Sequence, residues 1–341
     1  MMMKAFGASQ FLPAGHPDCF AECYLTVPEP GDRDLQVHVR AVSVNPVDCK
    51  VRASIQGRLM MPKILGWDVA GVVSAVGTQV TLFQPGDEIY YAGSIARPGG
   101  NSEYHVVDER IVGHKPKRLS FEESAALPLT TITAWESLFE RLHISPEPRS
   151  NRATLLIIGG AGGVGSMAMQ LANYAGVRVI ATASREVSRK WCLQLGAAHC
   201  INHRNDLKAE LDALGIKAVD YILCLNDTNY YWQAMADVIK PQGSICAVVS
   251  TKEAPDLNVL KNKSVTFAWE FMFTKALHGT ADMISQHRLL NRVAELVDQG
   301  LIKSTMTEHL GPLSAANLAK AHGRLESGKM VGKLVLSGVG T

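Results

Sequence analysis

A glycine-rich turn between two apolar segments constrains the fold of this chain more than any other feature. Residues 154–158 form a continuous apolar run typical of a buried strand, and residues 164–175 have the spacing of an amphipathic helix. Between them stands a G-x-G-x-x-G sequence, Gly160-Ala161-Gly162-Gly163-Val164-Gly165. Here the first glycines let the backbone approach a pyrophosphate, and Gly165 lets the helix pack close to the strand. We expect backbone N–H groups at the helix start to bind dinucleotide phosphates; a glycine-rich turn without a ligand is the alternative.

The segments around this turn alternate between strand and helix. Further apolar, β-branched runs predict strands at 178–181, 198–201, 219–223, 245–249 and 265–267. The intervening segments 186–195, 206–214 and 230–239 are long enough to be crossover helices. This order predicts an α/β fold: a doubly wound, parallel Rossmann sheet with right-handed crossovers.

The first third of the chain has a different texture. Short alternating segments, such as residues 69–76 and 88–91, are separated by frequent Gly and Pro turns, which favours a mainly β domain with a partly closed barrel. After about residue 272, a helix at 289–299 leads to a last strand near 332–336, which we place back on the first domain. A chain of 341 residues exceeds one ordinary core. We therefore predict one domain from 1–123 plus 272–341 and a second from 124–271.

The end of the strand at 178–181 predicts which nicotinamide cofactor binds. A site that prefers NAD places a carboxylate there to accept hydrogen bonds from the ribose hydroxyls. Here Ser184 and Arg185 offer a hydroxyl and a guanidinium instead, which suit the 2′-phosphate of NADPH. The sequence therefore predicts NADPH. In the alternative, Arg185 only opens a helix and Glu186 reaches the ribose.

Composition excludes several other classes of protein. A net charge of +2 creates no field that would attract nucleic acid, and no apolar run approaches the roughly 20 residues that span a bilayer. The seven cysteines contain no C-x-x-C pair, which argues against a disulfide framework and a structural zinc knuckle. No secretion signal is legible at residues 1–6. We expect a cytoplasmic protein whose partner is a small molecule, with no nucleic acid and no membrane.

Several short phrases fit one family pattern. They are NPVD at 45–48, LGWDVAG at 65–71, PGDEIY at 85–90, ALPLT at 126–130 and GKMVGK at 328–333. Together with the glycine turn, they resemble the medium-chain dehydrogenase/reductase superfamily, in its quinone oxidoreductase branch and the zinc-type alcohol dehydrogenase-like group. The resemblance covers nearly the whole chain. It implies a GroES-like catalytic domain built from both chain ends, a Rossmann domain between them, and a homodimer formed by pairing Rossmann edge strands.

The resemblance also implies positions for individual cofactor contacts. It places Thr130 near the nicotinamide, Asn226 near the middle of the cofactor, His203 near the adenosine phosphate and Lys333 near the pyrophosphate. Asn45 is implied as a contact of the nicotinamide ribose or of an oxyanion; a turn residue before Pro46 is the alternative.

The ligands of a catalytic zinc are missing. Zinc-dependent relatives have a cysteine where Asn45 or Pro46 stands here, a histidine at Trp67, and a four-cysteine loop after the Asp87 region. A catalytic zinc needs about three Cys, His or carboxylate ligands, and an indole is not one. His105, His114 and His143 have no metal-ligand spacing. We therefore expect no catalytic metal.

Hydride transfer without a Lewis acid favours particular substrates. In a quinone or an α,β-unsaturated carbonyl the developing charge delocalises, so one or two hydrogen bonds suffice. We expect an NADPH-dependent oxidoreductase of such substrates, with Trp67, Phe271 and Phe273 walling an apolar pocket unless they are core residues. Lys50 is a candidate proton donor if burial lowers its pKa; an exposed lysine with solvent as donor is equally consistent. The rival classes are a zinc-type alcohol dehydrogenase and an NADPH-binding protein without turnover.

Overall fold

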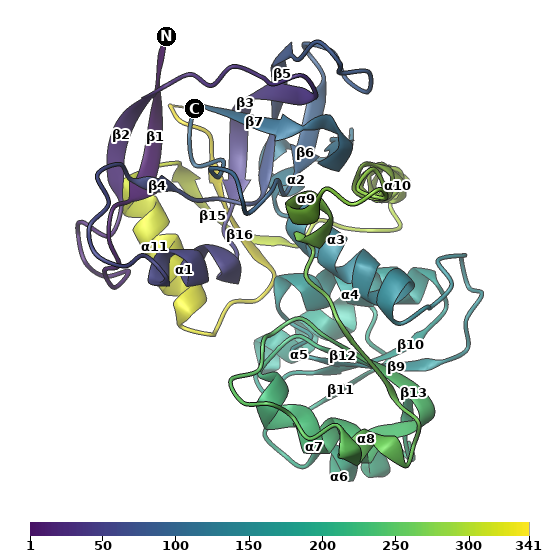
Figure 1. Cartoon of the computed structure of the whole chain (residues 1–341). Helices are drawn as coiled ribbons and strands as arrows, with labels where there is room; N and C mark the ends of the chain where they lie inside the picture. Colours follow the sequence, from purple (N-terminus) through teal and green to yellow (C-terminus); the bar gives the residue numbers. More distant parts are fainter. Residues whose placement is uncertain (341) are drawn as a thin grey trace. The chain divides into compact units, whose positions relative to one another are not determined.

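The chain divides into two units in the computed structural model, which describes residues Met1–Gly340 (Figure 1). The first, here called the two-segment unit, contains Met1–Ile132 and the residues from Phe273 onward. The second, the central unit, is Thr133–Met272. The sequence places the first boundary at 123/124, but the chain crosses at 132/133, inside helix α3 (Pro128–Trp135).

A six-stranded parallel sheet organises the central unit. Its strand order is β11-β10-β9-β12-β13-β14, and every neighbouring pair is parallel. The strands are β9 (Thr154–Ile158), β10 (Arg178–Thr182), β11 (His199–Ile201), β12 (Val219–Cys224), β13 (Ile239–Ala247) and β14 (Thr266–Trp269). The chain thus enters the sheet in the middle at β9 and continues to one edge at β11. It then crosses to the other side of β9 and continues from β12 to the opposite edge at β14. This confirms the predicted doubly wound Rossmann sheet.

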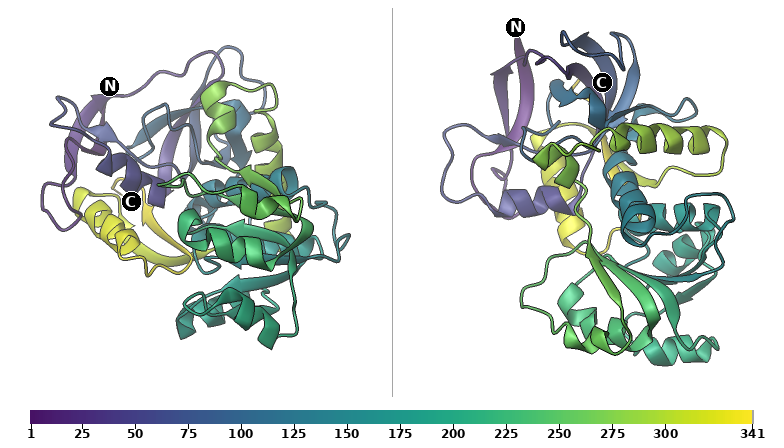
Figure 2. Two further views of the ribbon diagram at one scale, coloured as in Figure 1. Left: turned by 60° about the horizontal axis from the view of Figure 1, so that its bottom comes forward. Right: turned by 45° about the vertical axis from the view of Figure 1, so that its right-hand side comes forward.

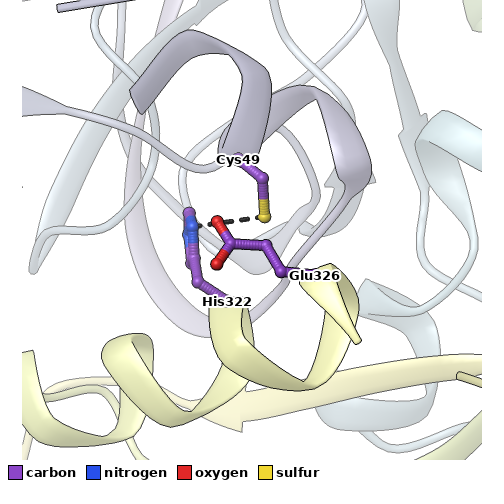
Figure 3. Close-up of side chains that lie close together, drawn as sticks. All are labelled: Cys49, His322 and Glu326. Atoms are coloured by element: carbon purple, nitrogen blue, oxygen red, sulfur yellow. Dashed lines mark hydrogen bonds between the residues drawn. The ribbon is translucent and has the colours of Figure 1, made fainter. Parts of the chain in front are cut away.

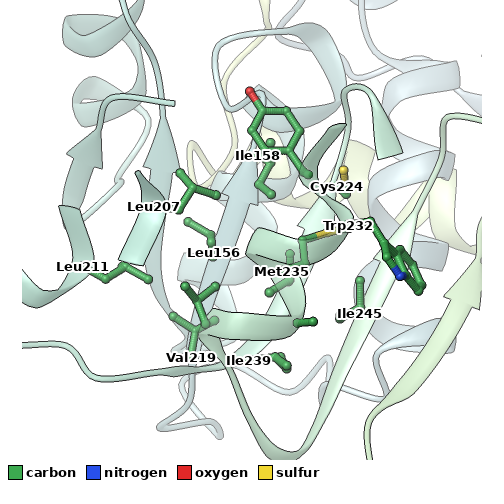
Figure 4. Packing of buried hydrophobic residues seen from close by; sticks show 14 of the residues in the cluster. Leu156, Ile158, Leu207, Leu211, Val219, Cys224, Trp232, Met235, Ile239 and Ile245 are labelled. Carbon is green, nitrogen blue, oxygen red and sulfur yellow. The ribbon is translucent and has the colours of Figure 1, made fainter. Parts of the chain in front are cut away.

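Helices connect these strands and supply the core. They are α4 (Gly163–Tyr174), α5 (Glu186–Gln194), α6 (Leu207–Ala213), α7 (Thr228–Val238) and α8 (Asn258–Lys261). Figure 4 shows apolar side chains of α6 and α7 packed against those of β9, β12 and β13, including Leu156, Leu211, Val219, Met235 and Ile245. Asp206 and Asp227 cap α6 and α7 by accepting N–H groups of the first turn. This packing fixes the parallel sheet, and the carboxyl ends of its strands lie along one edge of it.

The two-segment unit is built mainly from strands. A seven-stranded sheet has the order β15-β16-β3-β5-β6-β8, with β7 also paired to β3. A three-stranded sheet has the order β2-β1-β4. The strands are β1 (Met2–Ala8), β2 (Ala21–Thr26), β3 (Asp34–Ser43), β4 (Lys63–Ile64), β5 (Val69–Val76), β6 (Glu88–Tyr91), β7 (Tyr104–Asp108), β8 (Val112–His114), β15 (Met306–Pro312) and β16 (Lys333–Ser337). The pairing of β16 with β3 confirms that the last strand returns to the first domain.

Helices from both segments of the chain belong to this unit. They are α1 (Pro46–Ala53), α2 (Phe121–Ala125), α9 (Thr274–His278), α10 (Ser285–Asp298) and α11 (Ala315–Glu326). The structure places α1 against α11, so that segments far apart in sequence lie side by side (Figure 2). The sequence predicts α10 but starts it four residues late, and it does not predict α11. No helix among the described residues is both long and apolar enough to cross a membrane.

Candidate functional site

The glycine turn joins β9 to α4 with close backbone contacts. Gly159 has a φ of +90°, a conformation that side chains disfavour. A Cβ added to Gly160 would lie 2.7 Å from the Cβ of Ala181, and one added to Gly165 would lie 2.4 Å from the Gly160 carbonyl oxygen. Both positions therefore require glycine, since the turn packs directly on β10 and the helix packs directly on the turn.

The first turn of α4 presents N–H groups that find no acceptor. Within residues 1–340, the amides of Gly163, Val164 and Gly165 donate to no protein atom, and no side chain caps the helix at Gly162. A Cβ on Gly162 would meet nothing closer than 3.8 Å, so the space beside these amides is open. Free amides at a helix N-terminus bind anions because the helix dipole adds positive potential there. The residues present therefore fit the pyrophosphate of a dinucleotide.

Four predicted contacts lie at the same edge of the parallel sheet. Ser184 and Arg185 follow β10, His203 follows β11 and Asn226 follows β12, so all stand beyond the carboxyl ends of strands of the parallel sheet. Ser184, Arg185 and His203 are half-buried, and Asn226 is exposed. Burial lowers the pKa of His203, which keeps the imidazole neutral and able to donate or accept a hydrogen bond. The sheet brings these residues to the edge where the glycine turn ends β9.

The carboxylate of Glu186 points along its own helix. It lies 3.8 Å from the ammonium of Lys190, one turn further on, and both side chains are 70% exposed. This pair is weak because water screens it. Ser184 and Arg185 are the other polar side chains at the end of β10.

A buried polar network lies in the two-segment unit, around Lys333. The ammonium of Lys333 is 4% exposed and donates to the carbonyl of Val44, to Asn45 Oδ1 and to Asp68 Oδ2. The other oxygen of Asp68 accepts the N–H of Leu129 at 2.7 Å. All three N–H groups of Lys333 are therefore occupied. A contact between Lys333 and the pyrophosphate, as the resemblance implies, would need this network to open.

Asn45 is held in one orientation by the same network. Its amide nitrogen donates to Asp68 Oδ2 at 2.8 Å and to the carbonyl of Trp67 at 3.3 Å. Its carbonyl oxygen accepts from Lys333 and keeps one lone pair. Asn45 can thus accept a further hydrogen bond, as from a ribose hydroxyl, but has no N–H left for an oxyanion.

Asp48 adds a second buried carboxyl beside Asp68. Its two oxygens accept the backbone N–H of Asn45 at 2.6 Å and of Gly66 at 3.1 Å. Burial raises the pKa of Asp48 to about 7 and also raises the pKa of Asp68, while Lys333 opposes both shifts. Asp48 therefore anchors the start of α1, and the single ammonium of Lys333 offsets the charge on Asp68.

The remaining predicted residues differ in exposure. Lys50 lies on α1 with an exposed side chain, so the burial that a proton-donating lysine needs is absent there. Thr130 is buried, and its hydroxyl donates to the carbonyl of Leu127 at 2.9 Å, which leaves lone pairs to accept a further bond.

Two of the three predicted aromatic residues contact each other within the two-segment unit. The buried rings of Trp67 and Phe273 contact edge to face, with centroids 6.3 Å apart. The indole N–H of Trp67 donates to the carbonyl of Ser94 at 3.1 Å. Phe271 is 46% exposed and belongs to the central unit.

These residues do not fit a catalytic zinc. Neither the indole of Trp67 nor the amide of Asn45 is a ligand that zinc selects, and both side chains are committed to hydrogen bonds. The oxygens of Asp48 and Asp68 accept N–H groups as well. Among residues 1–340 one group of Cys, His and carboxylate side chains has metal-ligand spacing, and it includes none of these four.

The sequence does not predict the role of Asp68. Its carboxylate joins Asn45, Lys333 and Leu129, which come from three distant parts of the chain. The available signal is an acidic residue inside the apolar phrase at 65–71, because a buried charge needs a partner.

Comparisons with known proteins agree on the family. The family described as zinc-binding dehydrogenase matches residues 195–336, and the alcohol dehydrogenase GroES-like domain matches residues 31–117. A zinc-type alcohol dehydrogenase-like protein of Staphylococcus epidermidis is 43% identical over 98% of this chain and 99% of its own length.

Solved structures share the fold over the whole length. A protein from Rhizobium etli CFN 42, provisionally described as a zinc-dependent alcohol dehydrogenase, has a TM-score of 0.94 and 47% identity over 100% of this chain and 99% of that chain. A quinone oxidoreductase from Coxiella burnetii has a TM-score of 0.79 and 27% identity over 98% of this chain and 99% of that chain.

Proposed function

The chain belongs to the medium-chain dehydrogenase/reductase superfamily and is an oxidoreductase, and on that premise we propose that it uses NADPH to reduce quinones or α,β-unsaturated carbonyls without a catalytic metal. One combination of features carries the proposal. The helix start at Gly163–Gly165 has free amides that can bind an anion, and the side chains of Asn45 and Trp67 are not metal ligands.

The dinucleotide binds through its phosphates to the α4 amides. Their N–H groups already face open space, so binding requires no protein hydrogen bond to break. Arg185, with Ser184 beside it, selects the 2′-phosphate, while Glu186 stays with Lys190. A charge-assisted hydrogen bond contributes roughly 1.5–3 kcal/mol, enough for tenfold to hundredfold discrimination against NADH.

The buried network around Lys333 acts by positioning. It aims the remaining lone pair of Asn45, which accepts a ribose hydroxyl, and the lone pairs of Thr130 accept from the nicotinamide end. The bound nicotinamide supplies the hydride. Trp67 and Phe273 provide an apolar wall that favours flat, conjugated substrates.

The same network explains the choice of substrate class. An alkoxide from a simple ketone needs a strong local cation, and the ammonium of Lys333 is already neutralised by Asp68. A quinone or enone spreads the charge over its own atoms and needs less help. Because Lys50 is exposed and has no bond within the network, solvent is the proposed proton donor.

The test is a survey of NADPH oxidation with quinones, enones, aldehydes and ketones, repeated with NADH. We expect turnover with quinones or enones, a strong preference for NADPH, and little turnover with saturated ketones. Equal use of NADH and NADPH would contradict the cofactor assignment, and NADPH binding without turnover on any acceptor would contradict the activity.

A zinc-type alcohol dehydrogenase is the second candidate, favoured by the names of the relatives. It predicts ethanol oxidation that depends on added zinc. We expect none, because the residues at positions 45 and 67 do not bind zinc.

We also propose that the chain works in the cytoplasm as a homodimer joined along β14. This strand ends the central sheet, and Trp269 on it is 45% exposed. An open strand edge pairs readily with another copy. Light scattering of the native protein should give twice the chain mass, and Trp269→Glu should give monomers; a monomeric native protein at micromolar concentration would refute the dimer.

A further inference from the structure

A cluster of a thiol, an imidazole and a carboxylate joins helices α1 and α11, and the proposed reaction does not use it. Figure 3 shows Cys49 of α1 facing His322 of α11, with Glu326 one helical turn beyond His322. We propose that Cys49, His322 and Glu326 bind one divalent zinc-like cation, as a structural site separate from the nucleotide and substrate residues.

The distances between the donor atoms suit a tetrahedral ion. Zinc lies about 2.0–2.3 Å from nitrogen, oxygen and sulfur ligands, which places neighbouring ligand atoms roughly 3.4–3.6 Å apart. Cys49 Sγ and His322 Nδ1 are 3.3 Å apart, and all three donor atoms lie within 4.8 Å of one another. Only Glu326 has to move closer, and its side chain is 39% exposed at the end of α11.

The hydrogen bond between Cys49 and His322 orients both of these ligands toward each other. A thiol that donates to Nδ1 leaves the ring proton on Nε2 and the Nδ1 lone pair facing the sulfur. On binding, the S–H bond breaks, a sulfur–metal bond forms and one proton goes to solvent. The thiolate and the Glu326 carboxylate then supply two negative charges to the cation, and Glu326 also pairs with Arg52.

Arg52 limits the affinity of this site. Its fully buried guanidinium hydrogen-bonds one oxygen of Glu326 and also donates to the carbonyl of Leu12. One carboxylate oxygen therefore remains for the metal, but the cation binds beside a positive charge. We expect weaker binding than at a structural site with four protein ligands, with water in the fourth position.

Titration of the full-length protein with Co²⁺ after chelator treatment tests the site without using turnover. We expect one Co²⁺ per chain and a thiolate-to-cobalt charge-transfer band in the near ultraviolet. Cys49→Ser should abolish the band and weaken binding by at least about tenfold, whereas Cys23→Ser, a thiol on β2 of the same unit, should change neither.

A second variant guards against misfolding. Glu326→Gln keeps the hydrogen bond to Arg52 and the partly exposed site, and it should keep the band but weaken Co²⁺ binding roughly tenfold. Circular dichroism must show both variants folded; if Cys49→Ser fails to fold, Glu326→Gln decides. Absence of the band in the native protein, or an unchanged titration in folded Cys49→Ser or Glu326→Gln, would overturn the site. NADPH oxidation should persist in Cys49→Ser, so the metal site and the proposed reaction fail independently.

Discussion

At the scale of single residues, buried charge is tolerated only where a partner or a shared proton offsets it. Lys333 and Asp68 form such a pair, with a separation of 2.9 Å and almost no exposure. Removing one partner of a buried pair typically costs about 3–5 kcal/mol, because the other charge remains uncompensated. Loss of either partner would therefore also release Asn45, which hydrogen-bonds both of them.

Arg185 is the residue on which the cofactor assignment depends. We predict that Arg185→Ala raises the KM for NADPH roughly tenfold to hundredfold and leaves the KM for NADH unchanged, because only NADPH carries the 2′-phosphate. Steady-state kinetics with both cofactors measure this. Lys190→Ala removes a similar charge from the same helix and should change neither value. Equal losses for both cofactors in Arg185→Ala would contradict the prediction.

Glu270 should make the stability of the protein depend on pH. Burial and the neighbouring Glu136 raise the pKa of Glu270 from 4.5 to about 9, while Arg141 opposes the shift. The neutral carboxyl of Glu270 therefore makes its full contribution to the free energy of unfolding below about pH 4.5. This contribution is lost as the pH rises through about 9.

The substitution Glu270→Gln keeps the neutral shape and should flatten this dependence. Between about pH 5 and about pH 9 the free energy of unfolding should fall in the native protein. This fall should exceed the fall in Glu270→Gln by at least about 2 kcal/mol. Urea unfolding across this range measures the difference. Glu147→Gln, at an exposed site of the same unit, should follow the native curve. Parallel curves for all three proteins would disprove the protonated state.

At the scale of elements, the glycines of the turn between β9 and α4 have two different roles. Some allow close packing, and another leaves room for a bound ligand. Gly165 and Gly160 serve packing, since a Cβ on either one collides with neighbouring atoms. Gly162 serves binding, since a Cβ there meets no protein atom closer than 3.8 Å and would point into space beside the free amides. The same sequence motif therefore has two physical requirements.

Two alanine substitutions separate these requirements. Gly165→Ala should cost about 1–3 kcal/mol of stability as well as cofactor binding, because the helix must move away from the turn. Gly162→Ala should change stability by no more than about 0.5 kcal/mol but weaken NADPH binding at least about tenfold. Thermal unfolding and NADPH fluorescence titration measure both effects. Unchanged NADPH affinity in Gly162→Ala would count against phosphate binding at this turn.

The elements differ in how well the sequence predicts them. Strands β9, β10 and β12 are buried on both faces, so they read as apolar runs and are predicted almost to the residue. Helix α11 is missed although it spans Ala315–Glu326, because its apolar positions are sparse and Gly323 interrupts them. The π-helix at Glu136–Arg141 leaves no pattern either, since a local widening of a helix depends on tertiary packing.

The candidate sites divide in the same way. The glycine turn is local and has a fixed spacing, so its role is legible in the sequence. The network of Asn45, Asp68 and Lys333 and the pair of Cys49 and His322 join residues more than 250 positions apart in their longest links. Such contacts exist only once β16 and α11 return to the first part of the chain.

At the scale of the whole molecule, the chain assigns different tasks to its two units. The central unit presents free amides and polar side chains at one edge of its sheet. The two-segment unit holds the buried network around Lys333 and the edge-to-face pair of Trp67 and Phe273. This combination supports cofactor-driven reduction of conjugated substrates and leaves the Cys49 cluster free for a structural ion.

The most direct test of this account is the rate of NADPH oxidation with a quinone acceptor after chelator treatment, with the metal content measured on the same sample. We predict an undiminished rate in protein that holds far less than one metal ion per chain. A rate that vanishes on chelation and returns with zinc, in the native protein and in Cys49→Ser alike, would contradict it.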